Sequence, residues 1–188
     1  QAFGDPRRWH PVAGFGSAAM ALERRTYAAK RASGVTHVAV LVGATALLGV
    51  VAERATRKSR PAHTLVTAAA TWAVLGARSL TREADTIDGQ LRRGDLAAAR
   101  VQVRNLVGRE TAGLDVDDVA RACIESLAEN TSAAVVAPLL WGGLLGVPGL
   151  LGYRAINTLD AMVGHRNARY AEFGWAAARL DDVANWVP

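Results

Sequence analysis

The sequence predicts an all-α, polytopic membrane protein, in which amphipathic cytoplasmic helices accompany a membrane segment that is broken by Pro and Gly. Hydrophobic residues make up 51% of the 188 residues and aromatic residues only 6%. Ala, Val and Leu therefore supply the apolar mass, which is typical of packed or lipid-facing helices. Three apolar segments, at 35–52, 65–80 and 133–152, alternate with charged stretches of helical periodicity.

The first apolar segment follows a polar N-terminal stretch. We expect a loop at 4–12, GDPRRWHPV, because two prolines interrupt it, and then a short helix from Gly16 to Ser33. The segment 35–52 holds 18 residues without Asp, Glu, Lys or Arg. A helix of this length reaches about 27 Å, close to the roughly 30 Å hydrocarbon core of a bilayer, so we expect it to span.

The second apolar segment, 65–80, contains Arg78 near its end. It is therefore either a span whose Arg side chain reaches the interface or a buried core helix. Residues 81–132 are polar instead, with apolar residues at helical spacing, a break at Gly94 and a cap signal at Asp115. We expect these residues to form amphipathic helices outside the hydrocarbon.

The third apolar segment, 133–152, is uncharged and long enough to span, yet it is rich in helix breakers. These are Pro138, Gly142, Gly143, Gly146, Pro148 and Gly149. A continuous helix disfavours so many breakers, and irregular backbone at membrane depth is tolerated only inside protein or beside a wet cavity. A broken or re-entrant segment is therefore an alternative to a simple span, and an amphipathic tail follows.

The chain is basic, with 22 Lys and Arg against 17 Asp and Glu. Nucleic-acid binding is not expected, because these charges are spread along the chain and do not cluster with aromatic residues on one element. Anionic lipid headgroups or anionic substrates explain the charge instead. Basic residues flank the first span on both sides, so the positive-inside rule leaves its orientation open. The single cysteine, Cys123, supports no disulfide framework and no Cys-based zinc site, and we expect it in a core.

Carboxylates and Asn residues at helical spacing are the candidate site residues. Glu125 and Glu129 lie four residues apart, hence on one helix face, and Asn130 follows directly. Such a pattern is usually a solvated helix face. Because it comes immediately before the third apolar segment, it is also suited to a metal–phosphate site at a membrane boundary.

The same pattern recurs in the tail. Asn157 and Asp160 are three residues apart, and Asp181 and Asn185 are four apart with Asp182 adjacent. Mg²⁺ binds one or two carboxylates together with substrate phosphates and water. These residues are therefore candidates for holding Mg²⁺ and ATP, with a solvated helix face again the alternative. The sequence contains no P-loop, no H-E-x-x-H motif and no G-x-S-x-G motif.

Five sequence blocks, in this order, resemble the CobD/CbiB family of cobalamin biosynthesis. They are GDPRRWHPV, GDLAAARVQVRNLVGRET, RACIESLAENTS, APLLWGGLLGVPGLLGYRAINTLDAMVGH and FGWAAARLDDVANWVP. The resemblance implies a multi-pass enzyme of the inner membrane whose active site faces the cytoplasm. It implies an amide ligase, dependent on ATP and Mg²⁺, that joins aminopropanol phosphate (or aminopropanol) to the propionate of the corrinoid adenosylcobyric acid, giving adenosylcobinamide phosphate. The expected partners are these substrates, membrane lipid, and a second copy or other enzymes of the pathway.

The resemblance also implies site residues, position by position. The catalytic candidates are Glu125, Glu129, Asn130, Asp160 and Asp181. The substrate- or nucleotide-binding candidates are Asp5, His10, Arg109, Asn157 and Asn185, and the metal-binding candidates are Glu129, Asp160, Asp181 and Asp182. Because blocks on both sides of the third apolar segment belong to one site, we expect that segment to re-enter or the tail to fold back.

The chain departs from the family pattern in two ways. The family has an acid directly after ENTS, where this chain has Ala133. A catalytically impaired or non-catalytic homologue, acting as a sensor or scaffold, is therefore the alternative to an active ligase. The family pattern also continues beyond both ends of this sequence. We therefore expect residues 1–188 to form a single helical membrane domain that is the core of a longer chain.

Overall fold

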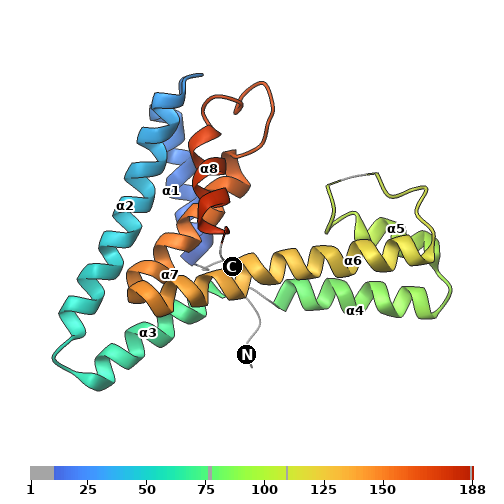
Figure 1. Cartoon of the computed structure of the whole chain (residues 1–188), viewed down its shortest axis with the longest axis horizontal. Helices are drawn as coiled ribbons and strands as arrows, with labels where there is room; N and C mark the ends of the chain where they lie inside the picture. Colours follow the sequence, from blue (N-terminus) through green and yellow to red (C-terminus); the bar gives the residue numbers. More distant parts are fainter. Residues whose placement is uncertain (1–10, 76–77, 109, 187) are drawn as a thin grey trace. The chain divides into compact units, whose positions relative to one another are not determined.

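The computed structural model describes residues 11–75, 78–108, 110–186 and 188. Within these ranges every regular element is a helix, which confirms the all-α part of the predicted fold class (Figure 1). The helices cluster into two compact units, which we call unit 1 (residues 1–75 and 136–188) and unit 2 (residues 76–135). Each unit is described by itself.

Unit 1 contains five helices: α1 (Pro11–Thr26), α2 (Arg31–Thr56), α3 (Arg60–Val74), α7 (Ala137–Val163) and α8 (Trp175–Ala184). The predicted span 35–52 lies wholly inside α2, so its helical structure is confirmed. The predicted helix from Gly16 to Ser33 is wrong at both ends. α1 begins at Pro11, since proline is favoured in the first turn of a helix, and four residues separate its end at Thr26 from the start of α2.

α3 differs from the predicted segment 65–80. It begins at Arg60, where the Ser59 side chain caps its N-terminus, and it ends at Val74 because Leu75 is extended. The 15 residues of α3 reach about 22 Å, which is shorter than the hydrocarbon core. Arg78 begins the next helix, so 65–80 is not one continuous span.

α7 is broken at Gly146, where φ is 70° and ψ is −151°, a conformation that is essentially restricted to glycine. The two halves of α7 fold back on each other there. A Cβ atom added at Gly149 would lie 2.0 Å from the carbonyl oxygen of Trp141, and Ala137 and Tyr153 belong to one apolar cluster. The predicted break is thus confirmed, and it takes the form of a helical hairpin whose two ends lie on the same side of its turn.

Two contacts with α2 hold the turn of this hairpin. The break frees backbone N–H groups that need a new partner, and the N–H of Val147 donates to Glu53 Oε1 (2.8 Å). Gly49 allows the close approach of the two backbones, since a Cβ there would lie 2.7 Å from Pro148 Cα. The end of α2 therefore acts as the N-cap of the second half of α7.

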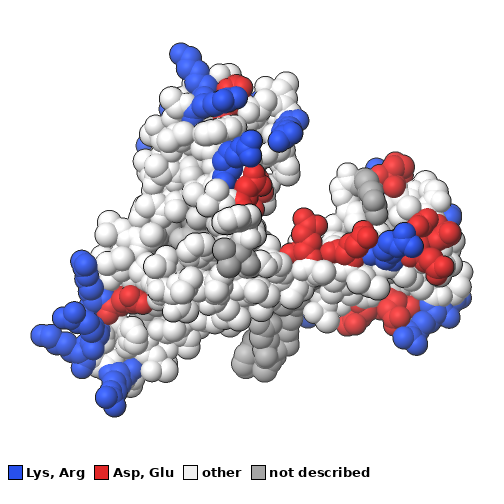
Figure 2. Space-filling model, viewed as in Figure 1, with Lys and Arg blue, Asp and Glu red and all other residues white. Residues whose placement is uncertain are grey.

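Two helical stretches among the described residues are long and apolar enough to cross a membrane. They are Arg31–Thr56, which belongs to unit 1, and Val116–Val163, which begins in unit 2 and includes the hairpin turn. Val40, Leu47 and Val51 are exposed on α2. Figure 2 shows Lys and Arg side chains at both ends of unit 1 and an almost uncharged band between them, a pattern consistent with a membrane protein.

Unit 2 contains α4 (Arg78–Arg92), α5 (Leu96–Val103) and α6 (Val116–Thr131), and a π-helical turn at Ser132–Val136 follows α6. Its core is small and apolar and includes Ile87, Ala99, Val103, Val119, Ala122 and Cys123. The predicted break at Gly94 is confirmed by a φ of 74°. Asp115 caps α6 by accepting a hydrogen bond from the Asp118 N–H (2.8 Å), also as predicted.

Candidate functional site

The structure places the predicted site residues in two groups, one in each unit. In unit 1, Asn157 and Asp160 lie on α7, Asp181 and Asp182 lie on α8, and Asn185 is the C-cap of α8. In unit 2, Glu125, Glu129 and Asn130 lie on α6. Asp5, His10 and Arg109 lie outside the described residues. The expectation that both groups serve one site stays a prediction.

A hydrogen-bonded chain of side chains connects α7 to α8 in unit 1. The Tyr153 hydroxyl donates to Asn185 Oδ1 (2.7 Å), and Asn185 Nδ2 donates to Asp181 Oδ2 (2.9 Å). The Trp141 indole donates to the Ala184 carbonyl (3.0 Å) and so fixes the end of α8 against the hairpin. The second oxygen of the carboxylate, Asp181 Oδ1, is buried and has no hydrogen-bond partner among the described residues.

The surroundings of Asp181 disfavour its charged form. Burial raises the pKa of this carboxyl group, and the negative charge of Asp160 raises it further. The Asn157 and Asn185 side chains offset part of this rise. A buried carboxylate oxygen without a donor, beside a second carboxylate, is an arrangement that a cation would stabilise.

The donors in this cluster fit Mg²⁺. Asp181 and Asp160 supply two carboxylates and Asn157 supplies an amide, while Mg²⁺ takes one or two carboxylates and completes its shell with phosphate and water. Asp182 is less suited, because its side chain is exposed and lies 3.6 Å from the Arg179 guanidinium. In the part of the chain that the structure describes, no three His, Cys, Asp or Glu side chains form a metal cluster, so phosphate oxygens would have to supply further ligands.

Cationic groups lie next to this cluster. A small hollow of about 80 Å³ is lined by His165, Arg166, Arg179 and Asp182, among others. His165 is close enough to Asp160 for its charge to act on that carboxylate. Arginine side chains beside paired carboxylates are suited to hold a phosphate chain together with its cation.

The second group lines a larger hollow in unit 2. Glu125, Glu129 and Asn130 border a cavity of about 470 Å³, together with Ser126 and the loop 106–108. The Ser126 hydroxyl donates to the Leu106 carbonyl (3.0 Å), which ties α6 to that loop. Asn130 Nδ2 donates to the Ser126 carbonyl (2.8 Å), so the amide stays on its own helix. Both Glu side chains are exposed.

Sequence reasoning missed Tyr153, which orients Asn185 through its hydroxyl group. A signal was present, because Tyr153, Asn157 and Asp160 are spaced four and three residues apart and so share one face of α7. It missed Arg166 and Arg179 as well. Arg179 lies three residues before Asp182, a spacing that places both side chains on one face of α8 and was a signal in the sequence. Arg166 lies at no helical spacing from the candidate acids, so only the fold identifies it.

Comparison with known proteins gives one consistent family. The model of the family described as CobD/Cbib protein matches residues 1–188. The chain is 54% identical over 185 residues to "Cobalamin biosynthesis protein CobD" of Mycobacterium tuberculosis (strain ATCC 25618 / H37Rv), covering 98% of this chain and 58% of the relative. A protein of the same name from Geobacter metallireducens is 45% identical over 192 residues, covering 99% and 60%.

A more distant relative of the same name, from Rhodobacter capsulatus, is 40% identical over 182 residues, covering 95% of this chain and 58% of the relative. The chain thus spans about three fifths of the length of these curated relatives. No solved structure matches it.

Proposed function

The chain belongs to the CobD/CbiB family of cobalamin biosynthesis, and from this premise we propose that it is the core of an amide ligase. The proposed reaction joins the amine of aminopropanol phosphate, or of aminopropanol, to the free propionate of adenosylcobyric acid at the expense of ATP. One structural observation supports it most directly. Asp181 Oδ1 is buried without a hydrogen-bond partner among the described residues, and the charge of Asp160 acts on the same carboxyl group. The next residue, Asp182, lines a hollow together with Arg166 and Arg179.

The proposed chemistry proceeds in two balanced steps. The propionate oxygen attacks the γ-phosphorus of ATP, so that an acyl phosphate forms and ADP leaves. The amine nitrogen then attacks the acyl carbon, the C–O bond to phosphate breaks, and the amine proton passes to a base as inorganic phosphate leaves. Both steps concentrate negative charge on phosphate oxygens, and bound Mg²⁺ would supply the neutralising charge.

The residues of unit 1 suit distinct roles in this chemistry. Asp181 and Asp160 would hold Mg²⁺, while Tyr153 and Asn185 keep the Asp181 carboxylate in place. Arg166 and Arg179 would bind ATP phosphates. In unit 2 the hollow beside Glu125, Glu129 and Asn130 is large enough for part of a substrate, and we propose that it positions the amine.

We propose that this chemistry takes place at the cytoplasmic face of the inner membrane, in a multi-pass protein. The helical hairpin of α7 supports the arrangement, because the chain leaves the hairpin on the side where it entered. A second copy or other enzymes of the pathway are the partners that we expect.

Turnover by the full-length protein in its membrane is the direct test. We expect conversion of adenosylcobyric acid, detected by chromatography and mass spectrometry, that requires both ATP and Mg²⁺ and releases one phosphate per amide. Conversion without ATP, or no binding of either corrinoid or nucleotide, would contradict the proposal.

Ala133 favours a second candidate, a homologue that binds the ligands without efficient catalysis. It lies half-buried on the π-helical turn directly after α6, and such turns frequently mark functional sites. If the missing acid takes part in catalysis, Ala133→Asp raises turnover by about a hundredfold or more, the lower end of the range for one acid–base group. Ala134→Asp, at the next position of the same turn, is the matched control. Equal effects of the two substitutions would show that position 133 has no special role.

A further inference from the structure

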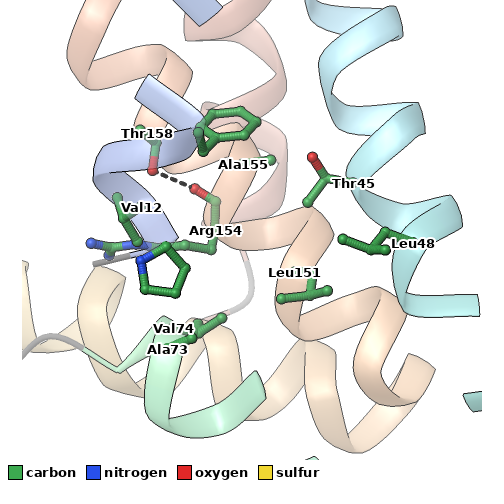
Figure 3. A pocket seen from close by; sticks show the side chains of 11 residues that line it. Val12, Thr45, Leu48, Ala73, Val74, Leu151, Arg154, Ala155 and Thr158 are labelled. Atoms are coloured by element: carbon green, nitrogen blue, oxygen red, sulfur yellow. Dashed lines mark hydrogen bonds between the residues drawn. The ribbon is translucent and has the colours of Figure 1, made fainter. Parts of the chain in front are cut away.

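α1 packs against the rest of unit 1 in two different ways. Near its start, Pro11, Val12 and Phe15 border a mostly apolar cavity of about 190 Å³ among α1, α2, α3 and α7 (Figure 3). In its last turn, the acidic residue Glu23 is only 8% exposed. A negative charge at the C-terminal end of a helix opposes the helix dipole, and a buried charge is costly unless it is paired. Glu23 therefore does not stabilise α1 itself, and its position depends on partners elsewhere in the unit.

The partners of Glu23 lie on the loop that joins α7 to α8, residues 164–174. Glu23 Oε1 accepts hydrogen bonds from Arg169 Nη2 (3.0 Å) and from the Tyr170 hydroxyl (3.0 Å). Asn167 Oδ1 accepts from the backbone N–H groups of Arg169 (3.0 Å) and Tyr170 (2.9 Å), which fixes the turn that carries both donors. One carboxylate of α1 thus holds two consecutive residues of a loop that is almost 150 positions away in the sequence.

Further contacts hold this loop against α1 and α2. The Tyr27 hydroxyl donates to the Arg169 carbonyl (3.0 Å), and the Arg169 guanidinium carbon lies 4.3 Å from the centre of the Tyr27 ring. Phe173 is fully buried, and a Cβ atom added at Gly34 would lie 1.8 Å from the Phe173 carbonyl oxygen. The loop therefore has no room to move toward α2, and Glu23 holds it from the side of α1.

The same loop forms one wall of the hollow that is lined by Arg166 and Arg179. The hollow is bordered from the loop by Gly164, His165, Arg166, Tyr170 and Ala171, and from α8 by Trp175, Ala178, Arg179 and Asp182. Tyr170 connects the two sites, because it lines the hollow and also donates to Glu23. The position of Arg166 relative to Arg179 therefore depends on where Glu23 holds the loop.

We propose that Glu23 is a positioning residue for phosphate binding in this hollow. Through Arg169 and Tyr170 it holds the loop at the distance from α8 at which Arg166 and Arg179 bind one phosphate chain. Buried ion pairs contribute little net stability, but in some proteins they specify a geometry, which is the role assigned to Glu23. The inference rests on the proposed function, because it takes ATP phosphates as the ligand of the hollow.

A second ion pair of the same loop provides the matched control. Glu172 Oε2 lies 3.0 Å from Arg31 Nε, the same distance as in the pair between Glu23 and Arg169. The Glu172 side chain is 50% exposed, however, whereas that of Glu23 is 11% exposed. Exposed ion pairs contribute little, so only the buried pair should fix the loop.

Calorimetric titration of the purified full-length protein with ADP and Mg²⁺ tests the proposal, because ADP binds without turnover. Glu23→Gln should raise the Kd for ADP about tenfold, the lower end of the range for groups that orient a ligand, and Glu172→Gln should leave it unchanged. In turnover assays, Glu23→Gln should raise the KM for ATP by a similar factor and leave the KM for adenosylcobyric acid unchanged. A mere loss of folded protein would instead lower kcat and leave both KM values as they are.

Two further variants keep the test independent of the folding of the Glu23 variant. Tyr170→Phe removes one of the two hydrogen bonds and keeps the ring, so it should raise the Kd for ADP about threefold. In a double-mutant cycle, Glu23→Gln should have little further effect once Arg166→Gln has removed the guanidinium that the loop positions.

An unchanged Kd in Glu23→Gln or in Tyr170→Phe, additive effects of Glu23→Gln and Arg166→Gln, or equal effects of Glu23→Gln and Glu172→Gln would overturn the inference and leave the ligase proposal standing. A wild-type protein that binds no ADP would contradict the proposed function as well, so the two failures are distinguishable.

Discussion

Unit 1 and unit 2 hold their acidic side chains in different ways. In unit 1, Asp181 is partly buried between α7 and α8, one of its oxygens accepts from Asn185, and the other has no donor among the described residues. In unit 2, Glu125 and Glu129 are exposed at the edge of an open hollow. An acid held under electrostatic stress is typical of a functional site, whereas an exposed pair is not, so the comparison ranks the cluster of unit 1 above that of unit 2.

The units also differ in what keeps them folded. Unit 2 has a small apolar core built from locally signalled helices, capped at Asp115 and turned at Gly94. Unit 1 depends on contacts between distant segments, above all the hairpin turn of α7 against the end of α2. A substitution in one unit should therefore leave the other intact.

The largest effect is expected at Asp181. Asp181→Asn keeps the hydrogen bond with Asn185 but removes the charge of one of the two carboxylates proposed to hold Mg²⁺. We therefore expect turnover to fall by about a hundredfold. Stability should change in the opposite direction. Because the folded state raises the pKa of Asp181, it holds the proton to higher pH than the unfolded state does, and the wild-type protein loses stability as pH rises from 3.8 to the raised value.

Thermal unfolding in detergent at pH 4 and pH 7 measures this effect. The gain in stability of Asp181→Asn over wild type should be larger at pH 7 than at pH 4. The reason is that the variant has no carboxyl group at this position to ionise as pH rises. Asp88→Asn, at an exposed position on α4, is the control and should leave turnover unchanged. Normal turnover in the Asp181 variant would remove the basis for ranking unit 1 first.

The next effect concerns the hairpin. A Cβ at Gly146 would lie 2.1 Å from Glu53 Oε1 and would force alanine into a glycine-only conformation, so Gly146→Ala should destabilise unit 1 by about 2 kcal/mol. Gly43→Ala on α2 is the control, because no atom lies within 4 Å of its added Cβ.

The rate of thiol labelling at Cys123 in the Gly146→Ala variant, mapped by peptide mass, reports on the core of unit 2. We expect this rate to stay unchanged, and faster labelling would show that the two units unfold together.

Sequence alone predicted the features that local signals encode. The uncharged run 35–52 identified α2, Asp115 marked the start of α6, and the Pro and Gly residues indicated the break in α7. The end of α3 at Val74 was missed because the apolar run continues past it to Leu80.

The missing parts of the candidate site depend on tertiary contacts instead. Spacing along one helix paired Asn157 with Asp160, but only the packing of α8 on α7 brings Tyr153 to Asn185. In the sequence, Glu53 belongs to a charged connector. Its hydrogen bond with the Val147 N–H joins residues 94 positions apart. No periodicity within a single helix carries that information.

The smallest effect is expected in unit 2, where it tests the ranking of the two regions most directly. Glu129→Gln removes a charge from the hollow without disturbing any hydrogen bond described for that side chain. We expect kcat/KM to fall about tenfold, which corresponds to an interaction worth roughly 1.4 kcal/mol. The free energy of unfolding should stay unchanged. Asp117→Asn removes a charge from the exposed first turn of the same helix, away from the hollow, and is the matched control. If Glu129→Gln behaves like Asp117→Asn, the acids of unit 2 form only a solvated helix face. If it costs as much as Asp181→Asn, exposure is a poor guide to function in this protein and both groups serve the reaction equally.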